Sequence, residues 1–194
     1  MIISVIFVLL FLAFLMGIIL VPKIDGKINM IKVAVMGIMA IFCYQSFWAF
    51  MFQLVGIPVN LKSTCISMAA AVLLLWGMII KKKKMQRIFV RITDIAVLAV
   101  LAGIVIAVSL HMFTPYLRLS YINSDPANHF NDAMVIVKQG VLGKHIYFSA
   151  FVNAMFIEIF SPILIVSKYY KAFIFADIFM HVLEVWMCYV LMLT

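Results

Sequence analysis

The stretch Ser124–Asp132, with the sequence SDPANHFND, holds side chains suited to acid–base or binding chemistry. Asp125, His129 and Asp132 follow one another at i, i+4 and i+7, so a helix would place them on one side. A carboxylate presented there could act as a base on a hydroxyl or help to hold a divalent cation. Asp125 before Pro126 is also an ordinary helix start, in which the Asp cap contributes about 1 kcal/mol. Both interpretations stay open.

A second polar set lies inside apolar segments nearer the C-terminus. Asp177, His181 and Glu184 share the i, i+4, i+7 spacing and would occupy an arc of about 60° on a helix. Each ionisable group at the centre of a bilayer costs about 2.5–3.5 kcal/mol. We therefore expect this stripe, together with Glu158, to face a protein interior or a water-filled cavity. A packing network, the lining of a substrate or proton path, and a metal site are the three open interpretations.

The surrounding chain is strongly apolar. Of its 194 residues, 68% are hydrophobic and 11% are charged, whereas a soluble domain has about 45–50% apolar and about 25% charged residues. This composition predicts an integral membrane protein. The net charge of +8 does not indicate a nucleic-acid partner, because the basic residues gather at the ends of apolar runs.

The apolar runs predict the number of membrane crossings, since a helix needs about 20 apolar residues to span a bilayer. Such runs lie at about 2–22, 33–57, 63–80, 93–113, 146–167 and 172–193. The predicted fold is therefore all-α and polytopic, with about six transmembrane helices. It divides into four N-terminal transmembrane helices (1–113), an extracytoplasmic loop (114–145) and two further transmembrane helices (146–194). The abrupt end of the last run suggests the front part of a longer protein.

Lysine and arginine predict the orientation. Eleven of the fifteen gather on one side, around residues 23–32, 81–91 and 168–171, and four lie on the other. The positive-inside rule places the larger group in the cytoplasm. We therefore expect a multi-pass protein of the cell membrane with its N-terminus outside.

The outer loop is predicted to contain an amphipathic helix on the membrane surface, beginning at Asp125 and ending at Gly140 or Gly143. At 100° per residue, one face carries Phe130, Met134, Val137 and Val141. The opposite face carries Asn128, His129, Asp132 and Gln139. We expect the apolar face to lie toward the lipid.

This loop resembles a known family. The order S-D-P-A-N-H-F-N-D-A-M, followed by an apolar turn and Gly140, is similar to the first large outer loop of membrane glycosyltransferases with the GT-C fold. The resemblance covers roughly Tyr121 to Tyr147. These enzymes have many transmembrane helices and take sugars from polyprenyl-phosphate donors. The chain departs from their pattern because its loop follows the fourth apolar run, it has no D-x-D pair, and it is far shorter.

The resemblance implies roles for individual residues. Asp125 would be the catalytic loop carboxylate, which deprotonates or orients an acceptor hydroxyl in an inverting transfer, and His129 would lie near the donor. A cation would stabilise the departing lipid phosphate. The expected substrate-binding residues are His129, Asp132, Arg118, Lys138 and Lys144. A divalent cation remains an open cofactor, because the D-x-D pair is missing.

The sequence thus favours a glycosyltransferase or glycosyltransferase-like protein in cell-envelope glycan assembly. Its partners would be the lipid bilayer and a lipid-linked sugar donor at the outer face. The alternative is not an enzyme. It is a small six-helix transport or substrate-binding component in which the stripe of Asp177, His181 and Glu184, with Glu158, lines the path. A scaffold beside a larger membrane complex is a third hypothesis.

Overall fold

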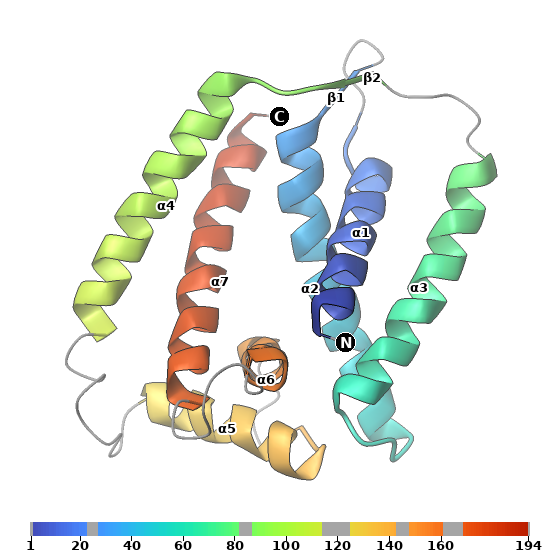
Figure 1. The fold of residues 1–194 in the computed structure, drawn as a ribbon, viewed down its shortest axis with the longest axis vertical. Coiled ribbons are helices and arrows are strands. Elements are labelled where there is room, and N and C mark those ends of the chain that lie inside the picture. The colour runs from blue at the N-terminus through green and yellow to red at the C-terminus, as the bar shows by residue number, and fades with distance from the viewer. Residues whose placement is uncertain are drawn as a thin grey trace. The chain divides into compact units, whose positions relative to one another are not determined.

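A computed structural model describes residues 2–22, 27–81, 87–113, 125–142, 148–160 and 169–193 (Figure 1). These residues form seven helices and two short strands. The helices are α1 (Ile2–Leu20), α2 (Met30–Leu54), α3 (Leu61–Lys81), α4 (Ile92–Phe113), α5 (Asp125–Gln139), α6 (Phe148–Phe160) and α7 (Tyr169–Met192). The strands are β1 (Lys27–Asn29) and β2 (Arg87–Phe89). The helical fold class is confirmed, and the small sheet is a feature that was not predicted.

Four helices are long and apolar enough to cross a membrane. Their candidate spans are Met30–Leu54, Leu61–Met78, Ile92–Met112 and Lys171–Met192. The first and fifth predicted spans contain shorter apolar helices among the described residues, Ile6–Leu20 and Ser149–Phe160. Only 6% of the Ile92–Met112 span is buried. So much exposed hydrocarbon is unfavourable in water and suits contact with lipid.

The chain divides into two compact units. Unit 1 comprises Met1–Gln45, Cys65–Gly103 and Leu183–Thr194, and unit 2 comprises Ser46–Thr64 and Ile104–Val182. Helices α2, α3, α4 and α7 each contribute residues to both units.

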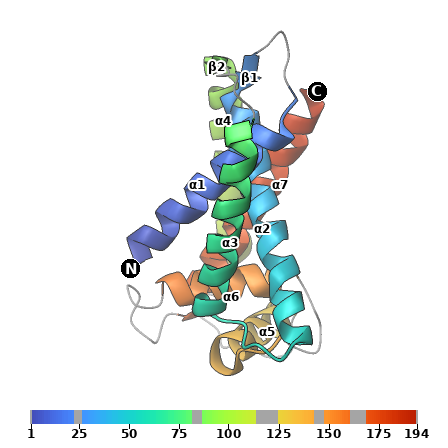
Figure 2. The ribbon, with the colours of Figure 1, turned by 90° about the vertical axis from the view of Figure 1, so that its right-hand side faces the viewer.

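In unit 1, α1 and α2 approach each other at two glycines, and both ribbon views show them in contact (Figures 1 and 2). A Cβ atom added at Gly17 would overlap the carbonyl oxygen of Val33, and one added at Gly37 would overlap the carbonyl oxygen of Ala13. Small residues at helix crossings let backbones approach closely, which is how helices in lipid gain packing energy. The crossing therefore requires glycine at both positions.

The two strands of unit 1 pair in parallel, with Lys27 opposite Arg87 and Asn29 opposite Phe89. This pairing brings the basic segment before α2 beside the basic segment after α3. The prediction placed both segments on the same side of the membrane, and their pairing agrees with that.

In unit 2, α5 packs against α6 (Figures 1 and 2). Helix α5 ends as predicted, because Gly140 adopts a positive φ of 68°, a conformation that glycine accepts without strain. The Gly140 carbonyl accepts a hydrogen bond of 2.6 Å from the Val59 N–H. Phe130 also makes an edge contact with Phe173, with ring centroids 5.5 Å apart. These contacts fix α5 to the segments before α3 and within α7.

Helix α5 buries part of its predicted polar side within the protein, and the expected contact of its apolar face with lipid stays a prediction. Ala133 and Ile136 are its buried apolar residues, and at 100° per residue they share a face with His129 and Asp132. Large apolar residues defined the predicted face, but the small Ala133 allows a neighbouring helix to approach more closely. Helix packing therefore turns the predicted polar side partly inward.

Candidate functional site

Unit 2 brings residues of the predicted outer loop together with residues of the final helix. Asp177 of α7 lies close enough to both His129 of α5 and His181 of its own helix for electrostatic interaction with each. His181 Nδ1 is 2.8 Å from the Asp177 carbonyl oxygen and 4.0 Å from its Oδ2. His129 of the predicted loop helix and Asp177 of the predicted stripe thus interact electrostatically, although the two sets were predicted independently.

The stripe itself is exposed unevenly. The Asp177 side chain is 28% exposed and the His181 side chain is 53% exposed. Glu184 is exposed and belongs to unit 1. Of the three side chains, only that of Asp177 is mostly buried within this chain. The three residues therefore do not line a common interior.

Several buried polar atoms of unit 2, among them Ser46 Oγ, lack a hydrogen-bond partner among the described residues. Asn153, which is 1% exposed, has neither its amide nitrogen nor its amide oxygen bonded. Asp132 Oδ2 and Glu158 Oε2 are also buried without a hydrogen-bond partner among the described residues. Leaving such an atom unbonded costs about 1–3 kcal/mol, and nearly all buried polar atoms are bonded. A water molecule or a polar ligand bonded to these atoms would remove this cost.

Several predicted site residues can be placed only in part. Helix α5 begins at Asp125, as expected, but the Asp125 side chain lies outside the described residues, as do Arg118 and Lys144. Lys138 is exposed in the last turn of α5. Of the predicted substrate-binding residues, His129 and Asp132 therefore lie on the helix that packs against α6, and Lys138 lies at the surface.

Within the described part of the chain, no three His, Cys, Asp or Glu side chains are grouped so that they could hold a metal ion. Asp177, His181 and Glu184 are all described, so the stripe does not form such a group. The packing and cavity interpretations therefore remain for Asp177, the one residue of the stripe whose side chain is mostly buried.

Unit 1 contains a buried polar network that was not predicted from the sequence. Asn29 Nδ2 donates a hydrogen bond to Asp94 Oδ2, and the Tyr189 hydroxyl donates to Asp94 Oδ1, both at 3.1 Å. Asn29 Oδ1 also accepts from the Ile31 N–H at 2.9 Å and so caps α2. A signal was present, because Asp94 is one of only seven acidic residues and stands at the head of an apolar run.

Comparison of the chain with protein-family models, curated proteins and solved structures found no match. The functional interpretation therefore depends on the residues and contacts described above.

Proposed function

We propose that the chain is a membrane glycosyltransferase, or a glycosyltransferase-like protein, that transfers a sugar from a lipid-phosphate donor at the outer face of the membrane. One observation carries this proposal. The helix that begins at Asp125 packs on α6 and buries polar atoms of His129 and Asp132 in the same unit as unbonded atoms of Asn153 and Glu158.

The chemistry of these groups suits a sugar. The Asn153 amide can both donate and accept hydrogen bonds, and the carboxylates of Asp132 and Glu158 accept them. Sugar hydroxyls do both, so they match this mixture of groups. The long apolar helices support a donor that is itself held in the membrane by a lipid.

In the proposed reaction, Asp125 takes the proton of the acceptor hydroxyl as that oxygen attacks the anomeric carbon. A bond forms between the acceptor oxygen and the anomeric carbon, while the bond from that carbon to the lipid phosphate breaks. The phosphate leaves with the bonding electrons, and a cation such as Lys138, Arg118 or Lys144 stabilises it. Attack opposite the leaving group inverts the anomeric configuration.

Asp125→Asn tests this role. General base catalysis contributes about 10²–10⁴-fold, so transfer from a lipid-linked donor in membrane vesicles should fall by about 100-fold or more. Asn131→Ala, an exposed residue on the same helix, is the matched control and should retain transfer. Thermal unfolding of both purified variants should resemble that of the wild type. Normal transfer by Asp125→Asn would exclude the proposed mechanism.

The electrostatic grouping of His129, Asp177 and His181 favours a second function, transport along a proton or cation path. Under that hypothesis, Asp177→Asn combined with Glu184→Gln should abolish substrate uptake into vesicles. Asp125→Asn should leave uptake unchanged. The opposite pattern, with uptake retained and transfer dependent on Asp125, supports the glycosyltransferase.

A further inference from the structure

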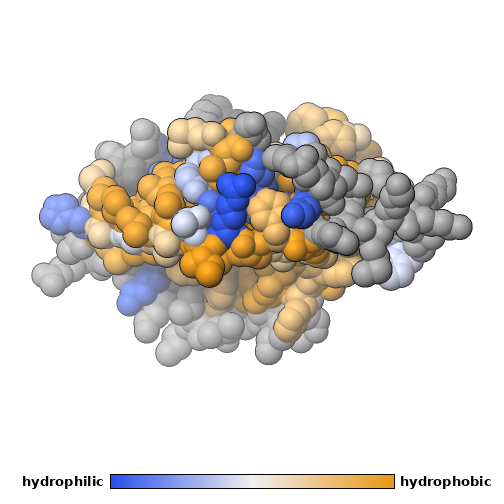
Figure 3. Space-filling model, turned by 90° about the horizontal axis from the view of Figure 1, so that it is seen from above, coloured by the Kyte–Doolittle hydropathy of each residue, from blue (hydrophilic) through white to orange (hydrophobic). Residues whose placement is uncertain are grey.

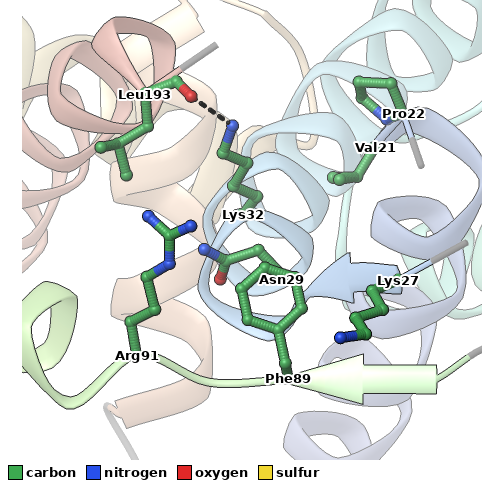
Figure 4. Close-up of a pocket in the computed structure, with 8 residues that line it drawn as sticks. All are labelled: Val21, Pro22, Lys27, Asn29, Lys32, Phe89, Arg91 and Leu193. Carbon is green, nitrogen blue, oxygen red and sulfur yellow. Dashed lines mark hydrogen bonds between the residues drawn. The ribbon is translucent and has the colours of Figure 1, made fainter. Parts of the chain in front are cut away.

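Unit 1 contains a small basic cavity, with a volume of about 40 Å³ (Figure 4). A cavity needs a volume of roughly 10–15 Å³ to hold one water molecule, so this cavity has room for about three water-sized groups. Its walls come from the segment after α1, from β1 and β2, from the beginning of α2, from Arg91 just before α4 and from Leu193 just after α7. Segments far apart in the sequence therefore build one site.

Three cations line the cavity, namely Lys27 of β1, Lys32 of α2 and Arg91, which follows β2. In Figure 4, the Arg91 side chain extends toward Asn29 and Lys32, and Lys27 lies on the other side of the Phe89 ring. Among the residues that the structure describes, no carboxylate is ion-paired with any of the three cations within 4.0 Å.

Lys32 is the central cation. It is only 5% exposed, and burying an ammonium group is costly unless it is paired and hydrogen-bonded. Its Nζ donates one hydrogen bond of 2.9 Å, to the Leu193 carbonyl oxygen. An ammonium has three N–H donors, so an anion in the cavity can bond to Lys32 and offset the cost of its burial.

The Asn29–Asp94–Tyr189 network lies beside this cavity and holds its wall in place. Among the described residues of this wall and network, the single negative charge of Asp94 stands against three cations. Both functional atoms of Asn29 are already used, Oδ1 in capping α2 and Nδ2 in bonding Asp94. Asn29 therefore positions the wall, while Lys27, Lys32 and Arg91 remain to bind a ligand.

We propose that this cavity binds a phosphate group, carried either by an anionic membrane lipid or as a free ion. Arginine and lysine donors suit phosphate oxygens through charge-assisted hydrogen bonds. The neighbouring Ile88, Val90 and Ile92 are 50%, 49% and 83% exposed, so they offer apolar contacts to acyl chains. Figure 3, which views the face with β1 and β2, shows hydrophilic side chains bordered by hydrophobic ones. This site uses none of the residues of the proposed transferase.

The test measures binding to the purified full chain in a neutral detergent, by native mass spectrometry. Phosphatidylglycerol, phosphatidylcholine and inorganic phosphate are added in separate arms. For a lipid ligand, phosphatidylglycerol binds more tightly than phosphatidylcholine, and inorganic phosphate does not displace it. For a free ion, inorganic phosphate binds alone and competes with phosphatidylglycerol.

Arg91→Gln and Lys27→Gln, both at exposed positions, should weaken binding of whichever phosphate source is bound by about tenfold each, the usual effect of losing a hydrogen bond to a charged group. Lys62→Gln removes the same charge at an exposed position outside unit 1 and should leave binding unchanged. Lys32→Gln should weaken binding most, and a thermal unfolding curve must show that this variant is folded. Equal binding by wild type, Arg91→Gln and Lys27→Gln would overturn the proposal, as would an equal loss in Lys62→Gln or no binding in any arm.

Discussion

Asn153 lies within α6 with 1% of its surface exposed, and neither of its amide atoms has a hydrogen-bond partner among the described residues. A residue kept for packing alone would be more stable as an apolar side chain of similar volume, because the desolvation cost of the amide would disappear. The proposed function gives another reason for the asparagine, namely bonds to a polar substrate. Stability and function should therefore respond to its replacement in opposite directions.

We predict that Asn153→Leu stabilises the protein by about 1–3 kcal/mol while it lowers substrate binding or transfer. Thermal unfolding in detergent measures the first effect, and the transfer assay in vesicles measures the second. Asn131→Leu, at an exposed position on α5, is the control and should change neither. Loss of stability in Asn153→Leu would show that the amide is bonded within the folded protein.

At the scale of elements, the α1–α2 crossing depends on two glycines whose places no side chain can take without movement of the backbone. Gly17 meets the Val33 carbonyl and Gly37 meets the Ala13 carbonyl. The obstacle is backbone in both cases, so rotation of a flexible side chain cannot relieve it. The two helices would have to separate.

Gly17→Ala and Gly37→Ala should each destabilise the protein by about 1–3 kcal/mol, the usual cost of overpacking. The melting temperature in detergent is the measurement. Gly77→Ala in α3 is the matched control, since a Cβ added there meets nothing within 4 Å. That variant should be neutral, or more stable by up to about 1 kcal/mol, because alanine favours helix. A melting temperature of Gly17→Ala equal to that of wild type would contradict the close crossing.

At the scale of the whole molecule, the distribution of basic residues predicts the orientation in the membrane. Eleven Lys and Arg residues lie on one predicted side and four on the other. A reporter enzyme that is active only outside the cell should be inactive when fused after residue 84 and active when fused after residue 120. A second reporter, active only in the cytoplasm, should give the reverse pattern at the same positions. A reversed map would also place Asp125 on the wrong face for an outer acceptor.

The sequence by itself determined the features that depend on local pattern. Four of the six long apolar runs form helices of membrane-spanning length among the described residues, and a helix is expected there because an apolar segment in lipid must satisfy its backbone hydrogen bonds internally. The helix from Asp125 to Gly140 was also predictable, since a capping acid, a proline and a terminal glycine act within a few residues.

Only the tertiary structure decided which of these features meet. Helical periodicity did not single out the side of α5 that is buried at Ala133 and Ile136, because that packing depends on the neighbouring helix. The pairing of Lys27–Asn29 with Arg87–Phe89 and the bond from Asn29 to Asp94 join residues that periodicity cannot relate. Contacts over such distances in the chain depend on how helices stack, and helical periodicity describes only one helix at a time. The basic cavity is lined by segments that are far apart in the chain, so the sequence did not predict it and the tertiary structure did show it.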